Sequence, residues 1–336
     1  MKATMVTAPG ETEVLDVPTP TVGPNDALVK MRACGICGSD SLYIAMGGIP
    51  PRQGCQPLGH EPAGEIVEIG SAVTGIAVGD HVVINPLAAP SGFIGNGGPG
   101  GALAEYLLIE EAVRGKSLEV VPDHIPFEVA ALNEPMAVAR HAVNQCAPAP
   151  GDRVVVFGAG PIGLGATMAF RSLGVAHIVV VDLIPSRLDK ALKVGADAVI
   201  NTANEDLTAR LIELHGPGES MFPGKADTDI YLDAAGVPAV ISAAIGAAKT
   251  GARLGIVAVH KEPVSVDFLS VMSNEITIVG SMAYPDEIFE VTADIVANWE
   301  KYAEIVSHTI PFDDVDEALR LATTPGAADK VVVTFN

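Results

Sequence analysis

The stretch C-G-I-C-G-S-D, residues 34–40, holds two cysteines at a two-residue spacing. Cys34 and Cys37 could form a redox pair, supply ligands to a metal ion or be buried thiols without chemistry, because thiol–disulfide exchange and zinc binding use the same spacing. A chain of 336 residues with only four cysteines does not resemble a disulfide framework. The choice among these interpretations therefore depends on the rest of the chain.

Two other stretches carry side chains that bind metal ions. L-G-H-E-P contains His60 and Glu61, and L-N-E-P contains Glu134, and we expect both stretches to be non-helical. A thiolate, an imidazole and a carboxylate suit Zn²⁺, and three protein ligands leave a fourth position for water or substrate. Taken singly, Cys37 and His60 would more often be core residues, and Glu134 beside a proline would more often be a helix cap.

The stretch R-V-V-V-F-G-A-G-P-I-G-L-G predicts a dinucleotide-binding turn. Gly158, Gly160 and Gly163 form G-x-G-x-x-G between an apolar strand and a helix. The first glycine allows the tight turn, the second lets the backbone approach a diphosphate, and the third lets helix and strand pack closely. The residues expected to bind the cofactor in this turn are Gly158, Gly160, Pro161, Ile162 and Gly163.

An acidic residue follows at the spacing that this turn requires. Asp182 lies nineteen residues after Gly163, at the end of the apolar run I-V-V-V-D, where its carboxylate can accept hydrogen bonds from the adenosine ribose. A 2′-phosphate there would meet like charge, so NAD is expected in preference to NADP. Arg187 is also expected to contact the cofactor, and its guanidinium would partly accommodate such a phosphate. A second G-x-G-x-x-G match within residues 95–100 has no preceding strand and is expected to be a loop.

Strand and helix patterns predict an α/β fold in two domains. Residues 1–147 contain short β-type runs broken by Gly and Pro, which predicts a mostly β domain. Over residues 148–284 strand-like runs alternate with helix-like ones, which predicts a doubly wound parallel sheet of about six strands, the Rossmann arrangement. Residues 285–336 are too short for a domain and are expected to rejoin the first. The expected strands include 28–31, 64–69, 81–84 and 106–109 in the first domain and 153–157, 177–182, 198–200, 229–233, 253–259 and 276–279 in the second, with helices at 162–173, 186–194, 207–214 and 239–249.

These motifs resemble the zinc-dependent medium-chain dehydrogenases, in particular the polyol branch that contains sorbitol, butanediol and threonine dehydrogenases. The resemblance runs over nearly the whole chain, through C-G-I-C-G-S-D, G-H-E-P-A-G-E-I-V-E-I-G, G-D-H-V-V, G-A-L-A-E-Y, N-E-P-M-A-V-A, the glycine turn, D-A-A-G and G-S-M-A-Y-P-D-E-I-F-E. It implies a GroES-like catalytic domain, formed by residues 1–147 and 285–336, and a Rossmann NAD-binding domain.

The resemblance also implies the roles of the candidate metal ligands. It makes Cys37 rather than Cys34 the thiolate ligand and His60 the imidazole ligand, and it places Glu134 where polyol dehydrogenases have a glutamate. Glu61 is implied as a neighbouring or exchanging ligand. Because Cys37 and one carboxylate already neutralise Zn²⁺, we expect at least one of Glu61 and Glu134 to be free, or bound through water, when substrate is present. The residues expected to have no ligand role are Cys34, Cys55, Cys146 and His141.

The sequence departs from the family pattern in two places. Residues 85–101 lack the four closely spaced cysteines that hold a structural zinc in many relatives, so one catalytic zinc per chain is expected. Leu42 stands where many relatives have a histidine, so the proton path beyond its first residue must differ. The resemblance further implies a homo-oligomer, either a dimer or a tetramer.

The chemistry expected from these residues is hydride transfer between a secondary alcohol, diol or polyol and NAD⁺. Zn²⁺ would lower the pKa of the alcohol, and Ser39 would accept the leaving proton, unless its hydroxyl only binds the local backbone. Two alternatives stay open, a zinc-free quinone or enone reductase of the same superfamily and a non-catalytic NAD-binding sensor. Loops such as residues 43–51 would contribute to the substrate pocket, and they do not identify the substrate.

Composition argues against other classes of partner. The net charge of −21 disfavours nucleic acid and anionic membranes, both of which select basic surfaces. The uncharged stretch Val154 to Phe170 contains glycines and a proline and is shorter than the roughly 20 apolar residues of a membrane helix. The first residues show no apolar signal segment, and the few cysteines suit a reducing compartment, so a soluble cytoplasmic enzyme with a small-molecule substrate is expected.

Overall fold

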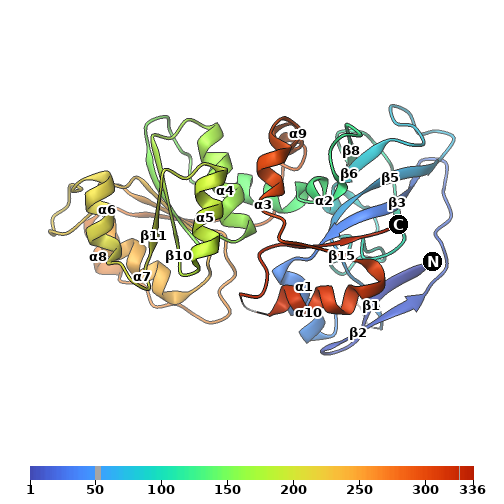
Figure 1. The fold of residues 1–336 in the computed structure, drawn as a ribbon, viewed down its shortest axis with the longest axis horizontal. Coiled ribbons are helices and arrows are strands. Elements are labelled where there is room, and N and C mark those ends of the chain that lie inside the picture. Colours follow the sequence, from blue (N-terminus) through green and yellow to red (C-terminus); the bar gives the residue numbers. More distant parts are fainter. Residues whose placement is uncertain (50–53, 325) are drawn as a thin grey trace. The chain divides into compact units, whose positions relative to one another are not determined.

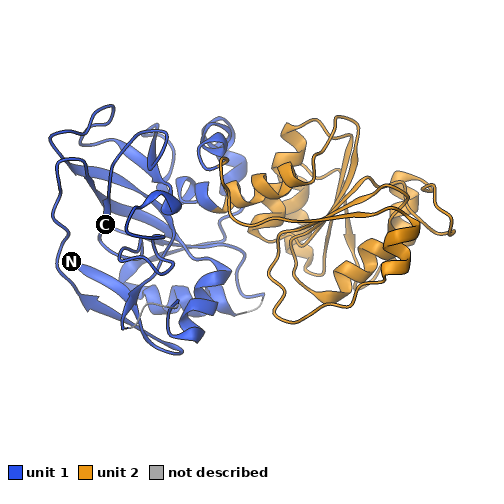
Figure 2. Cartoon of the chain, turned by 180° about the vertical axis from the view of Figure 1, so that it is seen from behind, with its two compact units in different colours: residues 1–134, 288–336 blue, residues 135–287 orange. Residues whose placement is uncertain are grey.

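The computed structural model describes residues 1–49, 54–324 and 326–336. They form two compact units: unit 1 contains residues 1–134 and 288–336, and unit 2 contains residues 135–287 (Figure 2). The division falls within helix α3 (Asn133–Gln145). Among the described residues we find no helix that combines the length and the apolar character needed to span a membrane. The predicted α/β class, a mostly β part and a Rossmann part, is confirmed.

Unit 1 is mostly β (Figure 1). Within the described ranges its larger sheet has seven strands in the order β15-β16-β3-β5-β6-β8, with β7 paired to β3, and a second sheet has the order β2-β1-β4. The strands are β1 (Lys2–Ala8), β2 (Glu11–Asp16), β3 (Ala27–Gly35), β4 (Gln56–Pro57), β5 (Glu61–Ile69), β6 (His81–Ile84), β7 (Tyr106–Ile109), β8 (Leu118–Val121), β15 (His308–Pro311) and β16 (Val331–Thr334). The helices are α1 (Gly38–Met46), α2 (Phe127–Ala130), α9 (Glu290–Ala303), α10 (Val315–Thr323) and the short 3₁₀ helices η1 (Pro86–Ala88) and η2 (Phe312–Asp314).

Two pairings of β3 bring distant parts of the sequence together. β5 runs antiparallel to β3 with Glu61 opposite Gly35. β16 pairs with the other edge of β3, with Val332 opposite Gly35. The segment that follows Gly35 therefore begins between the start of β5 and the start of β16.

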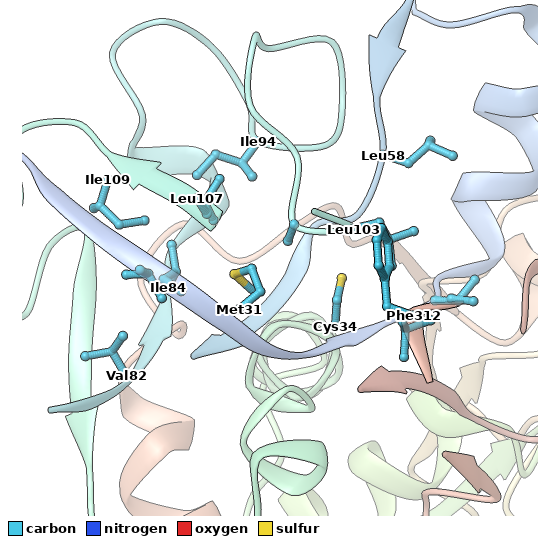
Figure 3. Packing of buried hydrophobic residues seen from close by; sticks show 14 of the residues in the cluster. Met31, Cys34, Leu58, Val82, Ile84, Ile94, Leu103, Leu107, Ile109 and Phe312 are labelled. Carbon is cyan, nitrogen blue, oxygen red and sulfur yellow. The ribbon is translucent and has the colours of Figure 1, made fainter. Parts of the chain in front are cut away.

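The core of unit 1 lies against β3 and includes Cys34, the first cysteine of the C-G-I-C-G-S-D stretch. Figure 3 shows Cys34 among apolar side chains that include Met31, Leu103 and Phe312. Cys34 is fully buried, and burial is the first cause that raises its thiol pKa far above the usual value. Cys34 is therefore a core residue with a protonated thiol.

Unit 2 is a doubly wound parallel sheet with the strand order β11-β10-β9-β12-β13-β14 in the described residues. Its strands are β9 (Arg153–Phe157), β10 (His177–Asp182), β11 (Ala198–Asn201), β12 (Ile230–Asp233), β13 (Arg253–Ile256) and β14 (Thr277–Gly280). Its helices are α4 (Pro161–Ser172), α5 (Pro185–Val194), α6 (Leu207–His215), α7 (Pro238–Ala247) and α8 (Phe268–Ser273). The central strand β9 is apolar at every position after Arg153, as expected for a parallel strand covered on both faces.

The predicted strands and helices of unit 2 are confirmed within a few residues, except that the strand expected at 253–259 ends at Ile256. The prediction of a non-helical setting for Glu134 is wrong, because this residue lies in the first turn of α3. Residues 95–100 form the predicted loop. Strands β1, β2 and β8 were not predicted from the sequence.

Candidate metal and cofactor sites

Three possible metal ligands meet in unit 1. One ligand atom from each of Cys37, His60 and Glu61 lies within 4.8 Å of the other two. Glu61 is the first residue of β5, His60 precedes it, and Cys37 is the N-cap residue of α1, two residues after β3 ends. The antiparallel pairing of β3 with β5 therefore brings the three together. His60 and Glu61 are buried, whereas Cys37 is half-buried.

Asp40, a fully buried residue in the first turn of α1, orients two of these ligands. The Cys37 backbone N–H donates to Asp40 Oδ2 at 2.9 Å, and Asp40 Oδ1 lies 3.3 Å from His60 Nδ1. Burial lowers the pKa of His60, but Asp40 and then Cys37 outweigh it, and the pKa rises well above its ordinary value. The surroundings of His60 thus favour positive charge. Our sequence analysis missed Asp40, although it ends the C-G-S-D motif and a carboxylate partner is common for a metal-binding histidine.

Lys330 places a buried cation beside Glu61. Its Nζ forms an ion pair with Glu61 Oε2 and donates to the Ile36 carbonyl at 3.0 Å. Burial disfavours the charged amine, yet Glu61, Cys37 and Glu134 together raise the pKa of Lys330. Sequence analysis missed this residue too, and the only signal was a lysine directly before the apolar strand β16.

The chemistry of this cluster fits a bound zinc ion. A thiolate, an imidazole and a carboxylate form a donor set typical of Zn²⁺. Glu61 Oε1 is buried and has no hydrogen-bond partner among the described residues, so it retains lone pairs for a cation. Glu134 is also buried, but it is not one of the three clustered residues. Its connection to this region is electrostatic, because its charge helps to raise the pKa of Lys330.

A hydroxyl group and two aromatic rings surround His60. Ser39 Oγ lies 3.4 Å from His60 Nε2, and the rings of Tyr43 and Phe93 each lie 6.1 Å from the imidazole, centroid to centroid. Tyr43 belongs to helix α1 and not to a loop, which corrects the expectation for residues 43–51. Positions 50 and 51 of that segment lie outside the described residues. Leu42, also on α1, is 48% exposed.

The glycine turn of unit 2 has the geometry that its pattern predicts. Gly158 has a φ of +93°, and a Cβ on Gly163 would lie only 1.7 Å from the Gly158 carbonyl oxygen. Gly160 differs from both, because its φ is −77° and a Cβ there would meet no atom within 4 Å. The space beside Gly160 is therefore open to a ligand at the N-terminus of α4, which begins at Pro161 and Ile162.

Asp182 lies beside the glycine turn and is held by the backbone. Its Oδ2 accepts from the Ala159 N–H at 2.7 Å, and its Oδ1 accepts from the N–H groups of Leu183 and Ile184 at 2.7 and 2.9 Å. A carboxylate oxygen has two lone pairs, so Oδ2 can still accept from a ribose hydroxyl, whereas Oδ1 already accepts two hydrogen bonds. Arg187 is half-buried in the first turn of α5.

In the part of the chain that the structure describes, the metal cluster includes neither the other cysteines nor His141. All four cysteines lie in the described ranges and are free thiols. Cys55 is exposed, and burial raises the pKa of Cys146 to about 11. His141 Nδ1 lies 2.9 Å from Glu287 Oε1, within hydrogen-bond distance.

Comparisons with known proteins find matches in both parts of the chain. The family model for the alcohol dehydrogenase GroES-like domain matches residues 23–118, and the model for zinc-binding dehydrogenases matches residues 161–298. The chain is 32% identical to (R,R)-butanediol dehydrogenase of Bacillus subtilis over 89% of each chain. It is 31% identical to sorbitol dehydrogenase of Bos taurus over 98% of this chain and 94% of that protein. The crystal structure of 2R,3R-butanediol dehydrogenase from Bacillus subtilis superposes with a TM-score of 0.87 at 28% identity, covering 100% of this chain and 99% of that one.

The fold and the matches define an oxidoreductase that acts on CH–OH groups. The chain belongs to the zinc-dependent medium-chain alcohol and polyol dehydrogenases. Similar structures carry either cofactor. A protein of Sinorhizobium meliloti 1021, with a TM-score of 0.85 and 27% identity over 99% of this chain and 98% of that one, is bound to NADP. An alcohol dehydrogenase of Escherichia coli CFT073, with a TM-score of 0.83 and 27% identity over 100% and 99%, is complexed with NADH.

Proposed function

We propose that this protein is a zinc- and NAD-dependent dehydrogenase that interconverts a secondary alcohol, diol or polyol with its carbonyl product. The observation that carries the proposal is the buried cluster of Cys37, His60 and Glu61 within 4.8 Å. A zinc-free reductase would have no use for such a donor set. The diol and polyol preference is supported by the butanediol and sorbitol dehydrogenases among the relatives.

In this proposal Cys37 and His60 hold the metal together with one carboxylate, from Glu61 or Glu134. Zn²⁺ in that position would act as a Lewis acid that favours ionisation of an alcohol hydroxyl, and NAD⁺ would accept the hydride. Cys37 and one carboxylate neutralise the ion, so the second carboxylate stays with the buried ammonium group of Lys330. In this proposal Asp40 Oδ1, which lies 3.3 Å from His60 Nδ1, orients the ring so that Nε2 would bind the metal.

Ser39 is proposed to take the proton from the substrate hydroxyl. Its Oγ is 3.4 Å from His60 Nε2, beside the position of the metal. Ser39→Ala should lower turnover by about 100-fold, the usual contribution of a positioned proton acceptor, while the zinc content stays at the wild-type level. Ser41→Ala, which removes a hydroxyl that donates to the Gly38 carbonyl, is the control. If Ser39→Ala keeps wild-type turnover, Ser39 is not part of the proton path.

Further parts of the proposal concern the cofactor, the domains and the assembly. The Asp182 carboxylate favours the ribose diol of NAD over the 2′-phosphate of NADP, although Arg187 is near in sequence. Unit 1 would serve as the catalytic domain and unit 2 as the cofactor domain, with one zinc per chain. We also propose a cytoplasmic homo-oligomer.

Metal analysis and an activity screen test the proposal together. Purified protein should contain about one zinc per chain and should reduce NAD⁺ with some member of a panel of secondary alcohols, diols, polyols and threonine, and NADP⁺ should be the poorer cofactor. Removal of zinc with a chelator should abolish the reaction, and added Zn²⁺ should restore it. Metal-free protein that retains full activity would refute the proposal.

A further inference from the structure

A histidine in unit 2 has no role in the chemistry proposed so far. His260 follows β13, and its Nε2–H donates to Asp233 Oδ2 at 2.7 Å. Asp233 ends β12 and is fully buried, and its other oxygen accepts from the N–H groups of Ala235 and Gly236, both at 2.9 Å. These bonds fix the orientation of the His260 ring.

The other nitrogen of this ring is without a partner. His260 Nδ1 is buried and has no hydrogen bond among the described residues, while the side chain as a whole is 15% exposed. A buried polar atom without a partner costs free energy, and in native proteins nearly all such atoms are paired. A ligand hydroxyl or amide group that reached Nδ1 would supply the missing partner.

The His260–Asp233 pair adjoins the glycine turn. β12 pairs with β9 so that Asp233 lies opposite Phe157, the residue before Gly158. A Cβ on Gly158 would lie 3.0 Å from the Ala234 carbonyl oxygen, so the two segments touch. β10, with Asp182 at its end, pairs with the other edge of β9. The glycine turn is thus flanked by Asp182 on one side and by the His260–Asp233 pair on the other.

This order fits the parts of a dinucleotide. Neighbouring strands lie about 4.8 Å apart, so the ends of β10 and β12 are about 10 Å apart. A dinucleotide with its adenosine ribose at Asp182 and its diphosphate at the glycine turn would carry its second ribose toward the end of β12. A ribose hydroxyl can either donate to a neutral imidazole nitrogen or accept from a protonated one.

We propose that His260 binds a hydroxyl group of the nicotinamide-side ribose through Nδ1, and that Asp233 is the positioning residue for its ring. The inference rests on the proposed use of a nicotinamide dinucleotide. It assigns a binding residue that lies outside the glycine turn and outside the metal cluster.

Calorimetric titration with cofactor fragments tests this assignment. NADH and ADP-ribose contain the second ribose, whereas ADP lacks it. His260→Ala should weaken binding of NADH and ADP-ribose about tenfold, the worth of one hydrogen bond, and should change the affinity for ADP less than about twofold. His124→Ala, which removes an exposed histidine of unit 1, should leave all three affinities unchanged.

A second variant separates ligand binding from packing. Glutamine at this position can keep the bond to Asp233 at the place of Nε2 but has no atom at the place of Nδ1, so His260→Gln should behave like His260→Ala. The inference is overturned if the glutamine variant binds like the wild type, if ADP binding falls as much as NADH binding, or if ADP-ribose binding is unchanged. Wild-type protein that binds neither NADH nor ADP would instead refute the proposed function and the inference with it.

Discussion

The two candidate sites stabilise their carboxylate groups in different ways. In unit 1 the carboxylates of Asp40 and Glu61 are fully buried, Glu61 pairs with the buried Lys330, and ligand atoms such as Glu61 Oε1 have no hydrogen bond among the described residues. In unit 2 the Asp182 carboxylate is held by three backbone N–H groups, and the glycine turn needs no outside group to keep its shape. The first site is complete only with a cation, whereas the second is preformed. Metal loss should therefore damage unit 1 and leave unit 2 intact.

The strongest test of this difference is removal of the thiolate. Cys37→Ala should lose the zinc and lower turnover at least about 1,000-fold, because the metal supplies several kcal/mol of stabilisation to the developing charge. Binding of NADH, measured by calorimetry, should stay within about twofold of wild type. Cys55→Ala, at an exposed position, is the control. A large loss of NADH affinity in the Cys37 variant would contradict the independence of the two sites.

The buried lysine offers the next largest effect. Lys330→Met should reduce the free energy of unfolding by about 3 to 5 kcal/mol, because the variant leaves the Glu61 carboxylate buried without its partner. Urea denaturation of the metal-free protein measures this change. Glu61→Gln in the same chain should recover much of the loss, since the double variant buries no unpaired charge. If the stability loss of the double variant equals the sum of the losses caused by Lys330→Met alone and Glu61→Gln alone, the lysine and the carboxylate do not stabilise each other.

Two glycines of unit 2 test whether its site is preformed. Gly163→Ala should destabilise the protein by about 1 to 3 kcal/mol, because the clash with the Gly158 carbonyl exceeds the gain of about 1 kcal/mol in helix propensity. Gly160→Ala should leave the melting temperature unchanged, since its Cβ enters open space, and yet weaken NADH binding about tenfold or more. Equal effects of the two substitutions on stability and on binding would show that the turn is not preformed.

The smallest expected effect is a pH dependence within unit 2. Burial, followed by the charges of His177 and Arg153, lowers the pKa of His215 to about 4, against the opposing pull of Asp229 and Asp227. The unfolded chain then binds more protons between pH 6.5 and 4, so stability is full above pH 6.5 and falls toward pH 4. After allowance for solvent screening the loss should be about 1 to 2 kcal/mol. Urea denaturation of His215→Asn across this range should show a shallower slope than wild type, and identical slopes would contradict the prediction.

The sequence predicts the unit 2 site better than the unit 1 site because a short motif determines the first. Gly158, Gly163 and Asp182 belong to adjacent strands and turns, and their spacing alone implies their geometry. Asp40 and Lys330 depend on tertiary placement. Lys330 lies 294 residues after Ile36, whose carbonyl it contacts, and no local pattern marks such a pair. Residues that support a candidate metal cluster through other side chains therefore escape pattern analysis even when the candidate ligands are predicted.

The error at Glu134 has a different physical origin. The sequence N-E-P begins a helix because Pro135 lies in the first turn of α3, where no backbone N–H is required. Strands β1 and β2 escaped prediction because β2 is mostly exposed and its sequence, E-T-E-V-L-D, has little apolar alternation. Their pairing is determined by the sheet and not by local propensity.

The contact between Lys330 and Glu61 also has a consequence for biosynthesis. A nascent chain can pair β3 with β5 long before residue 330 leaves the ribosome, but at that stage the carboxylate of Glu61 has no ammonium group to meet. The candidate metal site, with Lys330 beside Glu61, is therefore complete only after nearly all of this sequence has been translated. Ribosome-bound chains stopped before β16 should hold zinc more weakly than released ones.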